Sequence, residues 1–274
     1  MRNTFTPVAT ILPANAANKA LVWSSSNPAV AAVDPVTGAV TALKLGEAVI
    51  TAASTDGNSV KGSYAVKVTD GKVAQYSFEG NLNDFLQLSG AGSVAGAKLD
   101  SPTVGSITYG NGIAGQAAVF DGKSGIVLPK GLINSKSYSV SMWLKADQLT
   151  DYTTAFFGAA SGNRWISFVP QRGADKTLLW SGEKWYDALT GMQIPANEWT
   201  HVAFTVDDGT VKVYINGVEK FSGKNFPNVF TDNNGVFALG INYWDVPFKG
   251  MIDEVKIYNN SLTADEVLAD YNVN

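Results

Sequence analysis

The sequence predicts an all-β protein made of two domains. Charged residues make up only 16% of the 274 residues, below the roughly 25% usual for soluble proteins. Glycine and aromatic residues are frequent instead, and such a composition is typical of strands and turns. Short runs of alternating apolar and polar residues, separated by turn signals, support the same prediction. The composition changes near residue 70, so we expect a first domain over residues 1–70 and a second over residues 71–274.

The first domain is predicted to contain short strands separated by turns at residues such as Pro13, Pro28 and Gly38. A further turn is expected at Asp56-Gly57-Asn58. Strands this short and closely spaced suggest a small β-sandwich. The predicted strands cover residues 6–12, 20–24, 30–33, 39–42, 48–53 and 63–68.

Three motifs of this domain are similar to the bacterial immunoglobulin-like (Ig-like) domain of group 2. They are Leu12-Pro13-Ala14-Asn15-Ala16, Val22-Trp23-Ser24-Ser25-Ser26-Asn27-Pro28 and Thr37-Gly38-Ala39-Val40-Thr41-Ala42. The resemblance covers nearly all of residues 5–68 and implies an Ig-like sandwich that acts as a spacer. That family begins with a further strand, which is missing before Thr4. The chain is therefore expected to begin inside the domain and to have an exposed sheet edge.

Longer strands are predicted in the second domain. Residues 138–145 and 199–206 alternate strictly, as half-buried strands do. Asp208-Gly209 and Asn216-Gly217 predict two successive hairpins, because both residues of such turns need positive φ. Thr263-Ala264-Asp265-Glu266 is a capping box that predicts a short C-terminal helix. The other predicted strands cover residues 118–120, 211–215, 218–221, 236–241 and 251–258.

This second domain resembles the laminin-G-like, concanavalin A-type jelly roll of bacterial carbohydrate-active proteins. The motifs that carry the resemblance are Tyr76-Ser77-Phe78-Glu79-Gly80-Asn81, Ala118-Val119-Phe120-Asp121-Gly122, Val140-Ser141-Met142-Trp143-Leu144-Lys145, Trp199-Thr200-His201-Val202-Ala203 and Ile252-Asp253-Glu254-Val255-Lys256-Ile257-Tyr258. The resemblance covers residues 73–273. It implies a jelly-roll β-sandwich that works as a non-catalytic carbohydrate-binding module of an extracellular, secreted or cell-wall-attached glycoside hydrolase. Such a module would hold the enzyme on a polysaccharide or oligosaccharide. A cell-surface adhesin is the alternative, and a lyase or glycosidase of the same fold is less expected.

Composition excludes several functions. Without cysteine there is no thiolate nucleophile and no cysteine-bound metal. The single histidine, His201, is interpreted as a satisfied strand residue, with a lyase-type base as the alternative. A net charge of −4 argues against a nucleic-acid partner, and no apolar run reaches the length of a membrane span. The Glu-x-Asp-x-x-Glu strand of retaining glycosidases, which places two carboxylates on one face, does not occur in the sequence. We expect a monomer without membrane insertion.

An acidic loop at the start of the second domain suggests a calcium site. Oxygen-bearing side chains gather around Gly80, and hard oxygen ligands suit calcium. From spacing alone, a solvated acidic turn is favoured. The resemblance adds that the opening strand and the Ile-Asp-Glu strand are neighbours. By that match, a structural calcium ion would be bound by Glu79, Asn81, Asp84 and Asp253.

Aromatic residues mixed with polar ones suggest a sugar-binding surface. Sugars pack their flat C–H faces on indole rings, and polar side chains at the rim bind the hydroxyls. The doublets Trp185-Tyr186 and Tyr243-Trp244 are informative, because strand alternation cannot bury both members in one core. Core packing is the alternative, since tryptophan is usually well buried; Trp143 and Trp199 are expected to be structural, and Trp165 is consistent with either role. The predicted carbohydrate-binding residues are Trp180, Trp185, Tyr186, Tyr243, Trp244, Arg164 and Trp165.

Overall fold

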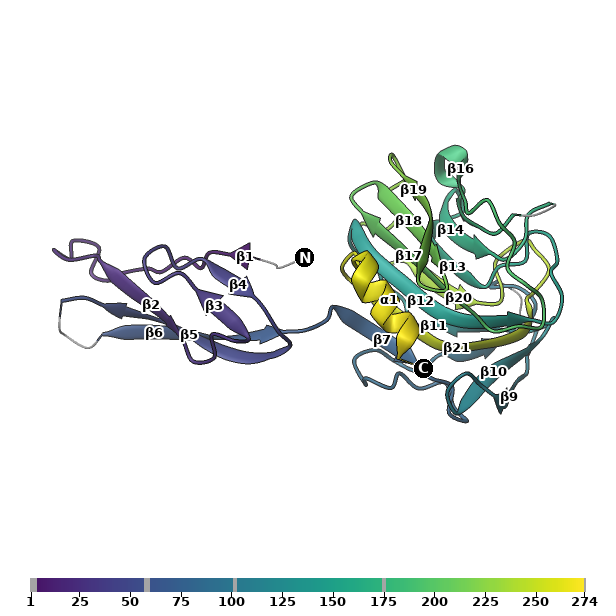
Figure 1. Ribbon diagram of the computed structural model, residues 1–274, viewed down its shortest axis with the longest axis horizontal. Coiled ribbons are helices and arrows are strands. Elements are labelled where there is room, and N and C mark those ends of the chain that lie inside the picture. Colours follow the sequence, from purple (N-terminus) through teal and green to yellow (C-terminus); the bar gives the residue numbers. More distant parts are fainter. Residues whose placement is uncertain (1–3, 57–59, 101–102, 174–175, 274) are drawn as a thin grey trace. The chain divides into compact units, whose positions relative to one another are not determined.

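The computed structural model describes residues 4–56, 60–100, 103–173 and 176–273. The chain forms two compact units, Met1–Asp70 and Gly71–Asn274, whose strands are labelled in Figure 1. The regular structure is almost entirely β, and the described residues contain one α-helix, α1 (Ala264–Asn272). The predicted all-β class with a short C-terminal helix is therefore confirmed. No described helix has both the length and the apolar character needed to cross a membrane.

The N-terminal unit contains two three-stranded antiparallel sheets. One sheet has the order β1-β4-β3 and the other β2-β5-β6. Their apolar side chains meet in a small core around Trp23, Val40 and Ile50. The strands are β1 (Thr4–Phe5), β2 (Leu21–Ser25), β3 (Ala31–Val33), β4 (Val40–Ala42), β5 (Gly46–Ser54) and β6 (Lys61–Val68).

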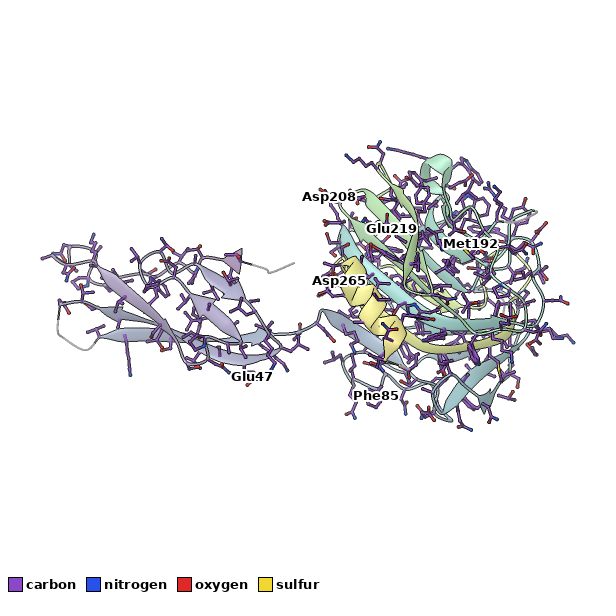
Figure 2. The ribbon with its side chains drawn as sticks, in the orientation of Figure 1. Glu47, Phe85, Met192, Asp208, Glu219 and Asp265 are labelled. Atoms are coloured by element: carbon purple, nitrogen blue, oxygen red, sulfur yellow. The ribbon has the colours of Figure 1, made fainter. Side chains whose placement is uncertain are left out.

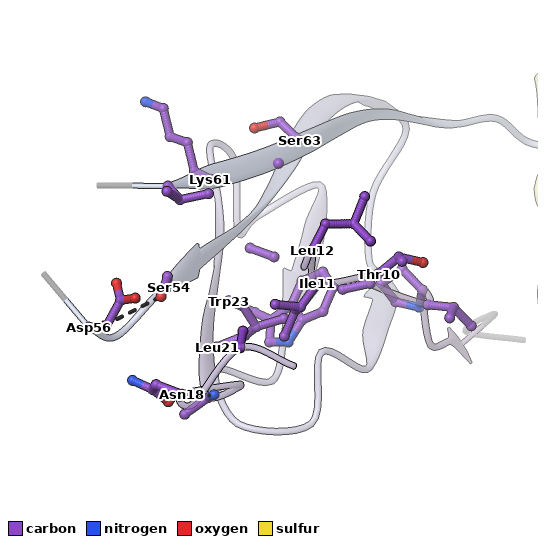
Figure 3. Close-up of a pocket in the computed structure, with 18 of the residues that line it drawn as sticks. Thr10, Ile11, Leu12, Asn18, Leu21, Trp23, Ser54, Asp56, Lys61 and Ser63 are labelled. Carbon is purple, nitrogen blue, oxygen red and sulfur yellow. Dashed lines mark hydrogen bonds between the residues drawn. The ribbon is translucent and has the colours of Figure 1, made fainter. Parts of the chain in front are cut away.

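One predicted strand of this unit does not form. Residues 6–12 have no regular structure, and Val8 is 95% exposed. The apolar side chains of this segment therefore have no core to face, which is what specifies a strand and its register. An open pocket separates the segment from β2, β5 and β6, with Trp23 on its wall (Figure 3). Gly57 and Asn58 of the predicted turn lie outside the described residues.

The C-terminal unit is a sandwich of two antiparallel sheets. The larger sheet has the order β19-β18-β17-β12-β21-β10-β9, and β7 pairs with the second half of β21. The smaller sheet has the order β16-β15-β14-β13-β20-β11-β8. The elements are β7 (Lys72–Tyr76), β8 (Ser93–Ala95), β9 (Ile107–Asn111), β10 (Gln116–Asp121), β11 (Gly125–Leu128), β12 (Ser137–Ala146), β13 (Phe156–Ser161), β14 (Arg164–Val169), β15 (Leu178–Ser181), the 3₁₀ turn η1 (Glu183–Trp185), β16 (Tyr186–Leu189), β17 (Thr200–Asp207), β18 (Thr210–Ile215), β19 (Val218–Gly223), β20 (Val236–Leu239) and β21 (Lys249–Tyr258).

The inner faces of the two sheets form one large core. Phe204 of β17 packs edge-on against Phe156 of β13, with ring centroids 5.7 Å apart. Every second residue of β12 belongs to this core, whereas Ser139, Ser141 and Trp143 point to the outer face. The strict alternation predicted for β12 is therefore confirmed, and it follows from burial of one face.

The predicted turns and helix start are also confirmed. Asp208, Gly209, Asn216 and Gly217 all have positive φ, as both hairpin turns require. Thr263 caps α1 through its side chain, and the Glu266 carboxylate accepts a hydrogen bond from the Thr263 backbone N–H in return. These local signals work because each depends on neighbouring residues alone.

Strands β13 to β16 of the smaller sheet are not predicted by the sequence pattern. Both faces of these strands carry large apolar side chains, so the alternation of apolar and polar residues is lost. Phe156 faces the inner core while its neighbour Phe157 joins a second cluster on the outer face. Residues 183–187 form η1 and the beginning of β16.

The outer face of the larger sheet is covered by α1 (Figure 1). Val267 of the helix packs on Ala203 and Tyr214 of this face. Beneath the helix, the Asp270 carboxylate accepts hydrogen bonds from Lys256 Nζ at 2.7 Å and from Ser141 Oγ. The helix is thus fixed by a small apolar contact and a buried charged network.

Candidate functional site

The outer face of the smaller sheet carries a group of aromatic side chains. Phe157, Trp165 and Trp180 project from β13, β14 and β15. Trp185 joins them from η1, and Tyr243 and Trp244 join them from the loop after β20. These six residues are called the aromatic cluster below.

Trp165 lies at the centre of the aromatic cluster. Its ring centroid is 5.0 Å from that of Trp180, 5.5 Å from that of Trp244 and 6.4 Å from that of Trp185. Trp165 is only 7% exposed, whereas Trp185 and Trp244 are 70% and 47% exposed. A buried indole therefore supports two indole rings that remain open to solvent.

The backbone before Trp185 is shaped to bring η1 close to the cluster. Gly182 lies so near Trp165 that a Cβ at this position would come within 2.1 Å of the indole ring. Lys184 and Trp185 both have left-handed φ, 60° and 50°, which costs non-glycine residues about 1–3 kcal/mol each. The Glu183 carboxylate accepts a hydrogen bond from Arg164 Nε at 3.0 Å and holds the start of this turn.

Two hollows flank the aromatic cluster. Hollow A is lined by Tyr152, Arg172, Gly173, Trp180 and Asp245. Hollow B is lined by Asp100, Ala159, Ala160, Ser161, Gly162, Val236, Tyr243 and Trp244. Aromatic faces and polar rim groups thus lie together, as ligand sites for polyhydroxylated molecules require.

The polar groups around hollow A are held by neighbours. The Arg172 guanidinium lies over the Trp180 ring, 5.8 Å from its centroid, and donates to Asp187 Oδ2 at 2.8 Å. The Asp245 carboxylate accepts a hydrogen bond from Asn242 Nδ2 at 2.6 Å. These contacts fix the directions of charged groups that a ligand could meet.

In hollow B, burial and the negative charge of Asp100 raise the pKa of the Tyr243 hydroxyl. The hydroxyl therefore stays protonated at neutral pH and is available as a hydrogen-bond donor.

Two predicted carbohydrate-binding residues lie outside the aromatic cluster. Tyr186 follows Trp185 but packs toward the inner core, with its ring 5.2 Å from that of Phe226. Arg164 precedes Trp165 and donates to Glu183 and to the Asn228 carbonyl oxygen at 2.7 Å. In both places neighbouring residues on the chain point to opposite sides of the sheet.

The sequence did not single out Tyr152, Arg172 and Asp245, although hollow A depends on them. Each belongs to a segment rich in aromatic and polar residues. The signal was present, but their proximity depends on the pairing of strands that were not predicted.

Three of the four predicted calcium ligands, Glu79, Asn81 and Asp84, line one hollow, and Asp253 does not line it. Asp84 Oδ1 accepts backbone N–H bonds from Gln75 and Leu86, and Oδ2 accepts them from Leu88 and Ser89. These four bonds use the acceptor capacity of a carboxylate. Burial raises the pKa of Asp84, but the four hydrogen bonds together lower it by more than burial raises it. The pKa of Asp84 therefore lies below its usual value.

Asp253 faces a different loop. The predicted pairing of the opening strand with the Ile-Asp-Glu strand is present as β7 and β21. Asp253 Oδ2, however, accepts N–H bonds from Ile113 at 2.9 Å and Ala114 at 3.3 Å. Burial raises the pKa of Asp253 to about 6.

Glu79 and Asn81 are also engaged locally. Glu79 accepts an N–H bond from Gln116, and Asn81 Nδ2 donates to the Glu79 carbonyl oxygen at 2.8 Å. Within the described ranges, no group of three or more His, Asp or Glu side chains is arranged to hold a metal ion. Asp84, Asp253 and Glu79 each accept hydrogen bonds from backbone amides, and calcium binding stays a prediction.

The single histidine lies on the other sheet. His201 is buried under α1, with Nε2 3.5 Å from Asp270 Oδ2 and its ring 5.3 Å from that of Trp143. The burial fits the predicted strand residue better than a general base, which must reach its substrate. The histidine is partnered at Nε2, but its buried Nδ1 has no hydrogen-bond partner.

A solved structure of a single domain is similar to this chain over nearly the whole length of that domain. Domain 4 of AbnA, a GH43 extracellular arabinanase from Geobacillus stearothermophilus, was solved in complex with arabinotriose. It is 54% identical to this chain, with a TM-score of 0.70, and the alignment covers 72% of this chain and 97% of that one.

More distant structures share the fold alone. The binding domain of Paraclostridial Mosquitocidal Protein 1 is 16% identical, with a TM-score of 0.54 and coverage of 74% of this chain and 52% of that one. The receptor binding domain of botulinum neurotoxin type G is also 16% identical, with a TM-score of 0.53 and coverage of 74% and 51%.

Relatives among curated proteins match a short part of the chain. Two uncharacterized proteins of Clostridium acetobutylicum are 44% identical over 63 residues and 45% identical over 69 residues. The matches cover 23% and 25% of this chain but only 16% and 7% of those proteins.

Two family models match in succession, and they confirm both resemblances predicted from the sequence. The bacterial Ig-like domain of group 2 matches residues 3–63, and the concanavalin A-like lectin/glucanases superfamily matches residues 120–268. The chain belongs to the concanavalin A-like lectin/glucanases superfamily, and a group 2 bacterial Ig-like domain precedes the lectin-like part.

Proposed function

We propose that the C-terminal unit is a carbohydrate-binding module that binds arabinan-type oligosaccharides on the aromatic cluster. The observation that carries the proposal is the pair of exposed indoles, Trp185 and Trp244, supported from below by the buried Trp165. The 54% identity to an arabinanase domain in complex with arabinotriose supports the sugar class.

The chemistry of the cluster suits a sugar. Exposed indole faces offer apolar, flat contact area at low cost in conformational entropy. Arg172, Asp245 and Tyr243 supply donors and acceptors for hydroxyl groups around the rings. Because Trp165 holds the exposed rings in place before a ligand arrives, less ordering has to be done on binding.

The proposed role is binding without catalysis. His201 is buried under α1 and is therefore out of reach of a substrate. Asp245 and Asp100 line different hollows, and Asp245 is hydrogen-bonded to Asn242. The module would keep an attached extracellular glycoside hydrolase on its polysaccharide and so raise the local substrate concentration.

Isothermal titration calorimetry of the 274-residue protein with arabinotriose tests this function. Trp185→Ala and Trp244→Ala should each weaken binding by at least about tenfold, since tryptophans at binding centres often contribute 2 kcal/mol or more. Phe85→Ala is the matched control. Phe85 is 69% exposed but lies on the opposite side of the C-terminal unit from β16 (Figures 1 and 2), so its loss should leave the affinity unchanged.

Two results would contradict the proposal. If Phe85→Ala weakens arabinotriose binding as much as Trp185→Ala and Trp244→Ala do, the aromatic cluster is not the binding site. If the protein binds no glycan on a broad glycan array and binds a protein partner instead, the adhesin alternative is favoured.

Calcium binding stays a prediction. Adding EDTA and following the melting temperature of the protein tests it directly. A lower melting temperature that calcium restores would support an ion at the Glu79–Asp84 loop. An unchanged melting temperature would leave these carboxylates as acceptors of backbone amides, as Asp84 is here.

A further inference from the structure

We infer that the aromatic cluster binds an uncharged sugar chain that lies across both hollows, rather than a single sugar in one of them. This inference rests on the proposed function and narrows it to a ligand class. It predicts how affinity depends on chain length and on ligand charge.

The two hollows are separate but adjacent. They share no lining residue, yet Trp244 lines hollow B and the next residue, Asp245, lines hollow A. Trp165 contacts Trp180 of hollow A and Trp244 of hollow B. The buried Trp165 therefore links a ring that lines hollow A to a ring that lines hollow B.

Each hollow has its own exposed indole. Trp185 lies beside Trp180, with ring centroids 5.6 Å apart, and thus belongs to the side of hollow A. Trp244 belongs to hollow B. The structure records no ring contact between Trp185 and Trp244, and each contacts Trp165, with ring centroids 6.4 Å and 5.5 Å from that of Trp165. Two separated stacking faces suit a ligand with at least one sugar on each.

The charges around the hollows favour a neutral chain. Among the residues that the structure describes, Arg172 is the one cation that lines them, and it is paired with Asp187 at 2.8 Å. The carboxylates of Asp245 and Asp100 also line the hollows, one in each. A chain of uronic acids would bring its carboxylates toward these groups, and like charges at short range repel each other.

Calorimetry with a ligand series tests the inference. Arabinose, arabinobiose, arabinotriose and trigalacturonate are titrated into the wild-type protein, Trp185→Ala, Trp244→Ala and the control Phe85→Ala. We expect the affinity to rise at least about tenfold from arabinose to arabinotriose, which corresponds to about 1.4 kcal/mol. Both tryptophan substitutions should weaken arabinotriose binding, whereas only one should affect arabinose. Circular dichroism and the melting temperature confirm that each variant is folded.

The outcomes separate this inference from the function on which it rests. Equal affinity for arabinose and arabinotriose, or a loss confined to one of the two tryptophan variants with arabinotriose, overturns the chain across two hollows and leaves sugar binding intact. Trigalacturonate should bind at least about tenfold more weakly than arabinotriose, and a gap that narrows with added salt supports a charge effect. Equal or tighter binding of trigalacturonate overturns the preference for an uncharged chain. Binding of none of these ligands overturns the proposed function itself.

Discussion

The two outer faces of the C-terminal sandwich are built in opposite ways. The face of the larger sheet is closed by α1, with Trp143 stacked on Tyr271 and a buried charged network around Asp270. No described helix covers the face of the smaller sheet, and there the rings of Trp185 and Trp244 are exposed above the buried Trp165. Aromatic side chains are thus covered on one face and partly exposed on the other.

The difference shows that residue type alone does not indicate function. Trp143 and Trp185 are both tryptophans on outer faces of one sandwich, and what distinguishes them is the element above each ring. An aromatic side chain that a helix of the same chain covers contributes to folding. One left uncovered on a rigid base is an unusual feature for a soluble protein and marks an interaction site. The predictions below test this contrast.

The largest expected effect concerns Asp270. Asp270→Ala should lower the free energy of unfolding of the C-terminal unit by about 3–5 kcal/mol. It removes the carboxylate 2.7 Å from the buried Lys256 Nζ and leaves only that of Glu254, 3.7 Å away. Urea titration followed by tryptophan fluorescence measures this, since Trp23 is the single tryptophan outside this unit. Asp265→Ala, at an exposed position of the same helix (Figure 2), is the control, with an expected loss below about 1 kcal/mol. Equal losses would contradict the role of the buried network.

A pair of matched tryptophan substitutions addresses the contrast itself. Trp143→Ala should cost about 3–5 kcal/mol of stability and leave the affinity for arabinotriose unchanged. Trp185→Ala should change stability by no more than about 0.5 kcal/mol but weaken binding. Unfolding curves give the change in stability of each variant, and calorimetry gives the change in its affinity for arabinotriose. If both substitutions mainly affect stability, the exposed face is only another part of the fold.

Lowering the pH should destabilise the C-terminal unit through protonation of Asp270, which lies under α1. Burial raises the pKa of Asp270, but the contacts with His201, Lys256 and Ser141 lower it more, and the net pKa is well below its usual value. The stabilisation is therefore complete above the unfolded carboxyl pKa of about 4 and is lost as pH falls below it. The melting temperature of the wild-type protein should fall toward that of Asp270→Asn between pH 5 and pH 2. A constant difference between the two would refute this linkage.

The smallest expected effect concerns the start of the covering helix. Thr263→Ala removes the hydroxyl that accepts the Glu266 N–H bond, and such caps contribute about 1 kcal/mol. Thr263→Ser keeps the hydroxyl and should restore most of the stability. Denaturant midpoints of the two variants measure the difference, and neither should alter sugar affinity. An equal loss in both would mean that the methyl group, not the cap, is important.

How much the sequence reveals differs between the two faces. The covered face was predictable, because Ser139, Ser141 and Trp143 alternate with core residues and Thr263-Glu266 marks the helix. The smaller sheet was not, since Phe156 and Phe157 are both buried and erase the alternation. The segment 6–12 shows the reverse error, an alternation for which no core exists.

The candidate site was predicted in part for the same reason. The doublets correctly indicated that Trp185 and Trp244 reach solvent. Arg172 and Asp245 could not be selected, because they approach each other only through the folding of distant segments. At Asp84, spacing alone does not distinguish a carboxylate that binds backbone amides from one that binds an ion.

The left-handed backbone at Lys184 and Trp185 has a consequence for the rates at which a sugar ligand would bind and leave. This backbone conformation forms when the protein folds, so, if the unit binds sugar as proposed, the backbone at Trp185 is already in place before the ligand arrives. Association can then proceed without waiting for a conformational step, and differences between ligands will appear mainly as differences in dissociation rate. A module of this kind would be distinguished by how long it stays on a chain rather than by how fast it finds one.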